Sequence, residues 1–189
     1  MVDANAQQDD ALVARAGAGD PGAFAELVRR HQNRVFGFIL RMTGSRDEAM
    51  DLSQDVFMKA WQSLPDWRPD ARFSTWLVQI ARNAAIDALR RRRTVEFAPL
   101  DDAFEVVDSA PGPEALYAAR QRHLQLEQAL QRLPTEQREI LLLREIEALS
   151  YTDIAQALGI REGTVKSRLA RARTALIERV QRKTGDKHG

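Results

Sequence analysis

The chain has 189 residues and a formal net charge of +1, with 44% hydrophobic and 29% charged residues. This composition is typical of a folded globular protein, and the length suits one ordinary domain or two small ones. Cysteine is absent and the three histidines lie far apart, which excludes disulfide scaffolds, thiol catalysis and cysteine-based metal sites. We therefore expect no metal and no cofactor. Without a bilayer-length apolar run or a signal peptide, we also expect a cytoplasmic protein with no membrane insertion.

The charge is distributed unevenly along the chain. Residues 1–95 carry 14 basic and 12 acidic side chains, residues 96–118 carry six acids and no base, and residues 119–189 carry 14 bases and nine acids. Two mildly basic blocks around an acidic segment favour two nucleic-acid-binding domains joined by a flexible acidic linker. The sign of solvated faces also fluctuates in ordinary proteins, so charge alone leaves that alternative open.

The hydrophobic periodicity is helical nearly throughout, which predicts an all-α fold. Residues 1–20 match no motif. The first expected helix covers 21–42, and the second covers 45–64, where an S-x-x-E capping box begins it. A loop rich in proline and aspartate spans 65–72, and a third helix follows at 74–93.

The second half of the chain begins with the weakly periodic segment 94–113, which we interpret as linker. Helices are predicted at about 116–132 and 135–147. A second capping box opens a short helix over 150–159, which ends at a Leu-Gly pair. The last helix is expected at 162–183.

Residues Tyr151 to Ala170 (YTDIAQALGIREGTVKSRLA) have the pattern of a helix–turn–helix. Gly159 allows the tight turn. The apolar seam of the second helix leaves small and basic side chains on the opposite face, which suits entry into a DNA major groove. The residues expected to contact duplex DNA are Thr164, Lys166, Ser167, Arg168 and Arg171. The alternative is an exposed basic helix in an ordinary bundle.

The helix at 45–64 has an unusual outward face. Met58 and Trp61 lie there beside Asp51 and Gln54, opposite the apolar stripe. A methionine and a tryptophan among polar side chains favour a protein-binding patch. The alternative is that another helix of the same domain covers them.

The helix at 74–93 carries an outer strip of aromatic, amide, apolar and basic side chains: Trp76, Gln79, Asn83, Ile86 and Arg90. Its expected inner face is Leu77, Ile80, Ala81, Ala84 and Ala88. Such a strip suits single-stranded DNA, because unpaired bases stack on aromatic rings and basic side chains neutralise phosphates. The preceding loop holds Trp67, Arg68 and Arg72, which could reach a splayed base. Trp76 could equally belong to the core.

Four segments resemble the extracytoplasmic-function group of the sigma-70 family, which are two-domain bacterial transcription initiation factors. They are DLSQDVFMKAW (51–61), FSTWLVQIARNAAIDALRRR (73–92), LPTEQREILLLREIEALSYTDIAQALGI (133–160) and EGTVKSRLARAR (162–173). They cover well over a third of the chain in the family's order and spacing. One departure is Arg161, where the family often has a serine or proline cap. Arginine cannot cap a helix, so the recognition helix could begin one residue away from the expected position.

The resemblance implies a sigma factor that binds core RNA polymerase, directs initiation at promoters of stress- or envelope-responsive genes, and catalyses nothing. Its region 2 bundle would bind the clamp helices of the largest subunit through Asp51, Gln54, Asp55, Met58 and Trp61. The same bundle would open and read the −10 element through Trp67, Arg68, Arg72, Gln79, Asn83 and Arg90, with Asn83 the strongest candidate for a base contact. Its region 4 helix–turn–helix would read the −35 element.

The resemblance also implies further partners. The linker would thread towards the RNA exit path, the polymerase flap would be a second contact, and an anti-sigma factor would hold the chain, which we expect to be a monomer. Two alternatives stay open on the residues. A stand-alone helix–turn–helix regulator would need a sensory N-terminal domain. An enzyme could use Asp51 and Asp55 for a metal, but no third carboxylate or histidine lies nearby in sequence.

Overall fold

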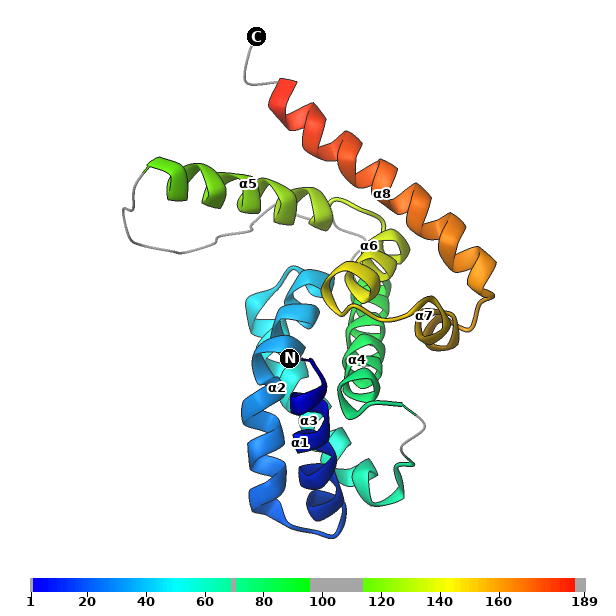
Figure 1. Cartoon of the computed structure of the whole chain (residues 1–189). Helices are drawn as coiled ribbons and strands as arrows, with labels where there is room; N and C mark the ends of the chain where they lie inside the picture. Colours follow the sequence, from blue (N-terminus) through cyan, green and yellow to red (C-terminus); the bar gives the residue numbers. More distant parts are fainter. Residues whose placement is uncertain (1, 69–70, 96–113, 186–189) are drawn as a thin grey trace. The chain divides into compact units, whose positions relative to one another are not determined.

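The computed structural model describes residues 2–68, 71–95 and 114–185 (Figure 1). Every regular element within these ranges is helical, which confirms the all-α prediction. The elements are α1 (Val2–Gly17), α2 (Pro21–Thr43), α3 (Arg46–Ser63), the short 3-10 helix η1 (Leu64–Asp66), α4 (Phe73–Val95), α5 (Glu114–Gln131), α6 (Thr135–Leu141), the π-helical turn η2 (Leu142–Ile146), α7 (Tyr151–Leu158) and α8 (Glu162–Gly185). The chain divides into two compact units, residues 1–98 and 99–189.

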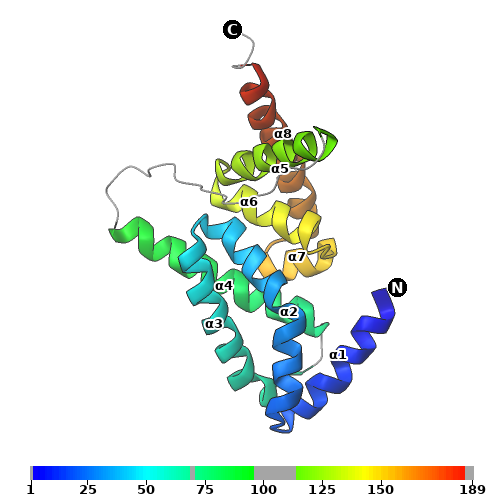
Figure 2. The same cartoon turned by 90° about the vertical axis from the view of Figure 1, so that its left-hand side faces the viewer.

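In the first unit α2, α3 and α4 pack against one another in pairs, and α1 packs on α2 and η1. Helix α1 is formed by residues to which the sequence assigned no structure, and it folds back beside α2 from a short turn (Figures 1 and 2). The largest fully buried side chains of this unit come mainly from α2 and α4: Leu27, Val35, Phe38, Ile39, Met42, Phe73 and Leu77.

The predicted ends of α2 and α3 agree closely with the structure, because local caps set them. The Asp20 carboxylate accepts hydrogen bonds from the backbone N–H groups of Gly22 and Ala23 and pairs with Arg15 at 2.6 Å. These donors lower the pKa of Asp20, the Ala23 amide most strongly. Gly44, with φ of 76°, ends α2, and the Ser45 hydroxyl caps α3 by accepting from the Glu48 amide.

The inner face of α4 differs in detail from the prediction. Ala84, expected inside, is half-buried, whereas Val78 and Ala85 are buried. The physical reason is that α4 packs against both α2 and α3, so its covered face is wider than a single seam and is rotated towards Ala85.

In the second unit α8 packs against α5, α6 and α7. The predicted helix over 135–147 is not one regular α-helix, since α6 continues into the wider π-helical turn η2. The side chains at 140–143, where the two meet, are buried. The turn η2 ends at Ile146, and Ala148, two residues later, has a positive φ of 54°. The Arg138 guanidinium is buried and donates to the carbonyls of Gln131 (2.5 Å) and Leu133 (3.1 Å), and burial lowers its pKa to about 10.

The acidic segment 96–118 extends beyond the weakly periodic segment, which ends at 113. Helix α5 begins at Glu114, so residues 114–118 are helical, consistent with a proline followed by an acidic residue at a helix start. Residues 96–113, the rest of the predicted linker, lie outside the described residues. Among the helices that are described, none combines the length and apolarity needed to cross a bilayer.

Candidate functional site

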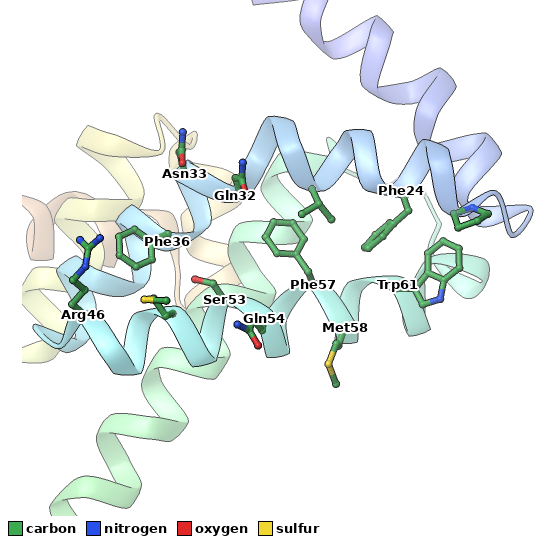
Figure 3. Close-up of a pocket in the computed structure, with 13 residues that line it drawn as sticks. Phe24, Gln32, Asn33, Phe36, Arg46, Ser53, Gln54, Phe57, Met58 and Trp61 are labelled. Carbon is green, nitrogen blue, oxygen red and sulfur yellow. The ribbon is translucent and has the colours of Figure 1, made fainter.

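An open groove of about 960 Å³ lies between α2 and α3 (Figure 3). Its walls are mostly apolar, and the side chains that line it are Pro21, Phe24, Val28, Gln32, Asn33, Phe36, Arg46, Met50, Ser53, Gln54, Phe57, Met58 and Trp61. Met50 and Met58 are 49% and 59% exposed, unusual values for large apolar side chains. Flexible, exposed methionines along an apolar groove are typical of a protein-binding surface.

Ring contacts mark the two ends of the groove. At one end Trp61 packs against Phe24, with ring centroids 4.9 Å apart (Figure 3). At the other end the Arg46 guanidinium lies over the Phe36 ring, 5.5 Å from its centroid. The groove is therefore built by side chains from both helices, and each end is held by a contact between α2 and α3.

The structure divides the five residues predicted to bind polymerase. Gln54, Met58 and Trp61 line the groove, whereas Asp51 and Asp55 are exposed on α3 and are not part of its lining. Trp61 is half-buried because Phe24 of α2 packs against it, so the alternative that another helix covers this residue holds in part, and its role in binding polymerase stays a prediction.

The α2 wall of the groove was not anticipated from the sequence. Phe24, Val28 and Phe36 recur at multiples of four residues, beside the buried stripe of the same helix. That second apolar stripe is the signal that could have revealed the wall.

Two tryptophans among the residues predicted to lie at unpaired DNA, Trp67 and Trp76, form an aromatic cluster with Phe73. The Trp67 and Trp76 ring centroids are 5.3 Å apart, and Phe73 lies 6.2 Å from Trp67 and 5.7 Å from Trp76. Phe73 is buried and both tryptophans are half-buried. Trp67 thus packs within the domain, and Trp76 is neither fully core nor fully exposed.

Along α4 the predicted strip is only partly exposed. Asn83 and Arg90 are exposed, whereas Gln79 and Ile86 are half-buried. The Asn83 side-chain oxygen accepts a hydrogen bond from the Arg82 guanidinium at 3.0 Å, which leaves the amide –NH₂ directed elsewhere. In the loop Arg68 and Arg72 are exposed, and residues 69–70 lie outside the described part of the chain.

The helix–turn–helix follows the predicted local signals closely. The capping box of Ser150 and Asp153 is complete, and Gly159 takes the left-handed conformation with φ of 63°. Helix α8 begins at Glu162, whose carboxylate accepts from the Thr152 hydroxyl at 2.7 Å. The Arg161 carbonyl accepts hydrogen bonds from the amides of Thr164 and Val165. The Arg161 guanidinium has only donors, so it cannot cap the amides at the start of this helix.

The exposed face of α8 is small and basic, as predicted. Lys166, Ser167 and Arg171 are exposed, whereas Thr164 and Arg168 are half-buried at the flanks. The seam beneath them is buried: Val165, Leu169 and Ala172. A narrow buried seam under small and basic side chains is the geometry of a recognition helix.

Charged contacts hold α8 to the elements that precede it. Arg173 pairs with Glu145 of η2 at 2.6 Å, and this carboxylate raises the pKa of Arg173. The Tyr151 ring lies between two cations, with Arg144 at 4.9 Å and Lys166 at 5.9 Å from its centroid. Lys166, one of the residues predicted to contact DNA, therefore has a cation–π contact with Tyr151.

Residues 27–95 match the family model of Sigma-70 region 2, and residues 123–176 match that of Sigma-70 region 4. The RNA polymerase sigma-H factor of Pseudomonas aeruginosa is 37% identical over 183 residues, which cover 93% of this chain and 95% of that protein. The chain belongs to the extracytoplasmic-function group of the sigma-70 family. It is a sigma factor, and it directs RNA polymerase to promoters.

Other relatives agree with this assignment. The extracytoplasmic-function sigma factor SigM of Mycobacterium tuberculosis strain H37Rv is 37% identical over 170 residues, which cover 90% of this chain and 83% of the relative. Among solved structures, CnrH in complex with the cytosolic domain of CnrY has a TM-score of 0.67 at 29% identity, covering 90% of this chain and 96% of that one. The sigma factor RpoE of Bartonella quintana, in complex with the anti-sigma factor NepR, has a TM-score of 0.68 at 28% identity, covering 84% and 96%.

Proposed function

We propose that the groove between α2 and α3 is the docking site of this sigma factor for core RNA polymerase. Its occupant is the apolar face of a clamp helix from the largest subunit. The observation that carries the proposal is the continuous apolar lining with two exposed methionines and the half-buried Trp61. Asp51 and Asp55, exposed on α3 outside the lining, are placed to pair with basic side chains beside that apolar face.

Promoter opening is proposed for α4 and the loop before it. Asn83 is exposed on α4, and its –NH₂ can donate to a base edge while the oxygen accepts from Arg82. The half-buried Trp67 and Trp76 offer ring faces for stacking, and Arg68, Arg72 and Arg90 offer charges for phosphates. Because ring stacking and the Asn83 contact need an unpaired base, they shift the equilibrium from closed towards open promoter DNA.

Recognition of the −35 element is proposed for the exposed face of α8. Lys166, Ser167 and Arg171 can reach base edges or phosphates in the major groove, with Thr164 and Arg168 at the flanks. This division of labour needs only binding, so we propose that the chain catalyses no reaction itself and acts in the cytoplasm as a monomer on polymerase. The flap is the proposed polymerase contact of the second unit.

An anti-sigma factor is proposed as a competing partner, since RpoE of Bartonella quintana was solved with one. The groove between α2 and α3 is the surface it would use here, because covering this groove would also prevent polymerase from docking.

The test is transcription on a genomic promoter library with core polymerase, with and without the full chain. The expected result is a set of run-off transcripts that requires the chain. A Met58→Glu variant places a charge in the groove and should abolish both core binding and those transcripts. A Lys59→Glu variant, exposed on the same helix outside the groove lining, is the matched control. Docking at the groove is wrong if both variants bind core polymerase equally well.

A further inference from the structure

Helix α1 precedes the region 2 match, which begins at residue 27, yet it is firmly attached to the first unit. Val13 and Ala16, on the inner side of α1, are buried. Arg15 pairs with Asp20 across the turn to α2. Gly17 approaches η1 so closely that a Cβ there would lie 3.7 Å from the Leu64 carbonyl. An element held in this way by packing and charge has a fixed position relative to η1 and the loop that follows.

A nearly buried polar pair joins α1 to α2. The Asp9 carboxylate lies 2.8 Å from His31 Nε2, and the two side chains are only 14% and 10% exposed. The second oxygen of Asp9 accepts from Arg30 at 3.2 Å. The carboxylate therefore restrains the imidazole ring, because it holds one ring nitrogen in place by a hydrogen bond.

The His31 ring in turn supports the aromatic cluster. Its centroid lies 5.4 Å from that of the buried Phe73, in an edge-to-face arrangement. Phe73 touches both Trp67 and Trp76. A chain of direct contacts thus runs from the carboxylate on α1 through two rings to Trp67, within the loop at 65–72, and to Trp76, just after it.

We propose that Asp9 is a positioning residue for promoter opening: through His31 and Phe73 it holds Trp67 and Trp76 in the orientation that receives an unpaired −10 base. This inference rests on the proposed role of α4 and its preceding loop. It assigns a purpose to α1, which the family match leaves out. Each step of this pathway is a direct contact between two side chains. The effects of substitutions along it should therefore not be additive.

The experiment uses the full chain with core polymerase and a promoter. Permanganate reactivity of −10 thymines reports opening, and core binding is measured separately. Asp9→Ala should reduce opening about tenfold, the size typical of residues coupled through direct contacts, while core binding stays within about twofold of wild type. Asp9→Glu, which keeps a carboxylate, should restore most of the opening. Asp10→Ala, an exposed neighbour on α1, is the matched control and should open normally.

The decisive measurement is the double variant Asp9→Ala with Trp67→Ala. If Asp9 acts through the cluster, the double variant should open no worse than Trp67→Ala alone. Losses that multiply would overturn the proposal, because they would mean that Asp9 acts independently of Trp67. Normal opening by Asp9→Ala would overturn it as well, and so would an equal loss of core binding and opening.

A second variant guards against misfolding of Asp9→Ala. His31→Gln retains a donor for the Asp9 carboxylate but removes the ring against Phe73, so it should show the opening defect with α1 still anchored. Normal opening by this variant refutes the ring pathway. If Trp67→Ala itself opens the promoter normally, the proposed −10 role of the loop is wrong. This result differs from those that overturn the role of Asp9, so the two proposals can fail separately.

Discussion

Trp61 of α3 and Phe24 of α2 pack with ring centroids 4.9 Å apart, so one indole both joins two helices and lines the groove between them. Its two faces therefore serve different purposes. Truncation of Trp61 should lower both the free energy of unfolding and the affinity for core polymerase. The two losses together measure how much the side chain contributes to each.

We expect Trp61→Ala to weaken core polymerase binding by about 2 kcal/mol, roughly thirtyfold, because a tryptophan anchor is a frequent interface hot spot. Because the indole is only half-buried, the free energy of unfolding should fall by about 2 kcal/mol, less than for a core tryptophan. Chemical denaturation and titration with core polymerase measure the two losses. Trp61→Phe should keep the contact with Phe24 and most of the stability. A Trp61→Ala variant that binds core polymerase like wild type would contradict docking at this end of the groove.

Asn83→Ala should leave core binding intact and impair opening of the −10 element. The reason is that Asn83 is exposed on α4, where its –NH₂ group can meet a base edge. Permanganate footprinting measures the opening. Gln62→Ala, which removes an exposed amide from α3, should open normally. Normal opening by Asn83→Ala would remove this residue from the interface.

Arg171→Ala should cost about 1–3 kcal/mol in binding to −35 duplex and relax the preference at one base pair, as expected for a bidentate base contact. The side chain is exposed on the recognition face of α8. Competition with single-base variants of the duplex tests this. Arg173→Ala, which removes the pair with Glu145, should weaken binding without changing the preference. Uniform weakening by Arg171→Ala would mean that Arg171 contacts phosphate only.

Ala148→Gly should stabilise the second unit by up to about 1 kcal/mol. Ala148 has a φ of 54°, a conformation that costs an L-residue roughly 1–2 kcal/mol and glycine very little, and the greater freedom of glycine in the unfolded chain offsets part of the gain. Thermal unfolding should show a higher Tm. Ala170→Gly, in the interior of α8, should lower it. A lower Tm for Ala148→Gly would mean that its conformation is not strained.

Ionised Glu26 should stabilise the first unit near neutral pH and lose this contribution on acidification. Hydrogen bonds from Arg29 and Arg30 lower the pKa of Glu26 to about 2, from an ordinary value of 4.5. A pKa lowered in the folded state stabilises fully above the unfolded value, and the contribution is lost as the pH falls towards 2. The difference in Tm between wild type and Glu26→Gln should therefore be constant near neutral pH and shrink below pH 4.5. A difference that grows on acidification would have the wrong sign.

Much of the helical layout is predictable, because it depends on signals within a few residues. The caps at Ser45 and Ser150 and the glycines at 44 and 159 set helix ends that agree with the structure to within one or two residues. Helix α1 has no such signal. Its attachment depends on Asp9 meeting His31, 22 positions away, a pairing that no local pattern reveals.

The candidate site was predictable only where it lies on one element. The exposed face of α8 follows from the spacing of Val165 and Leu169. The groove does not, since Phe24 and Met58 form one surface only after α2 and α3 have packed together. For the same reason the spacing on α3 shows which way Trp61 points but not that Phe24 covers it.

The buried side of α4 has a mechanical consequence for promoter binding. Ala81, Ala85 and Ala88 have no side-chain rotamers to exchange, so this part of the seam cannot repack by a change of rotamer. The direction in which Asn83 faces is then settled when the domain folds. On the proposed role of Asn83, a −10 base would move to meet this amide, and the nucleic acid rather than the protein would bear the distortion on capture.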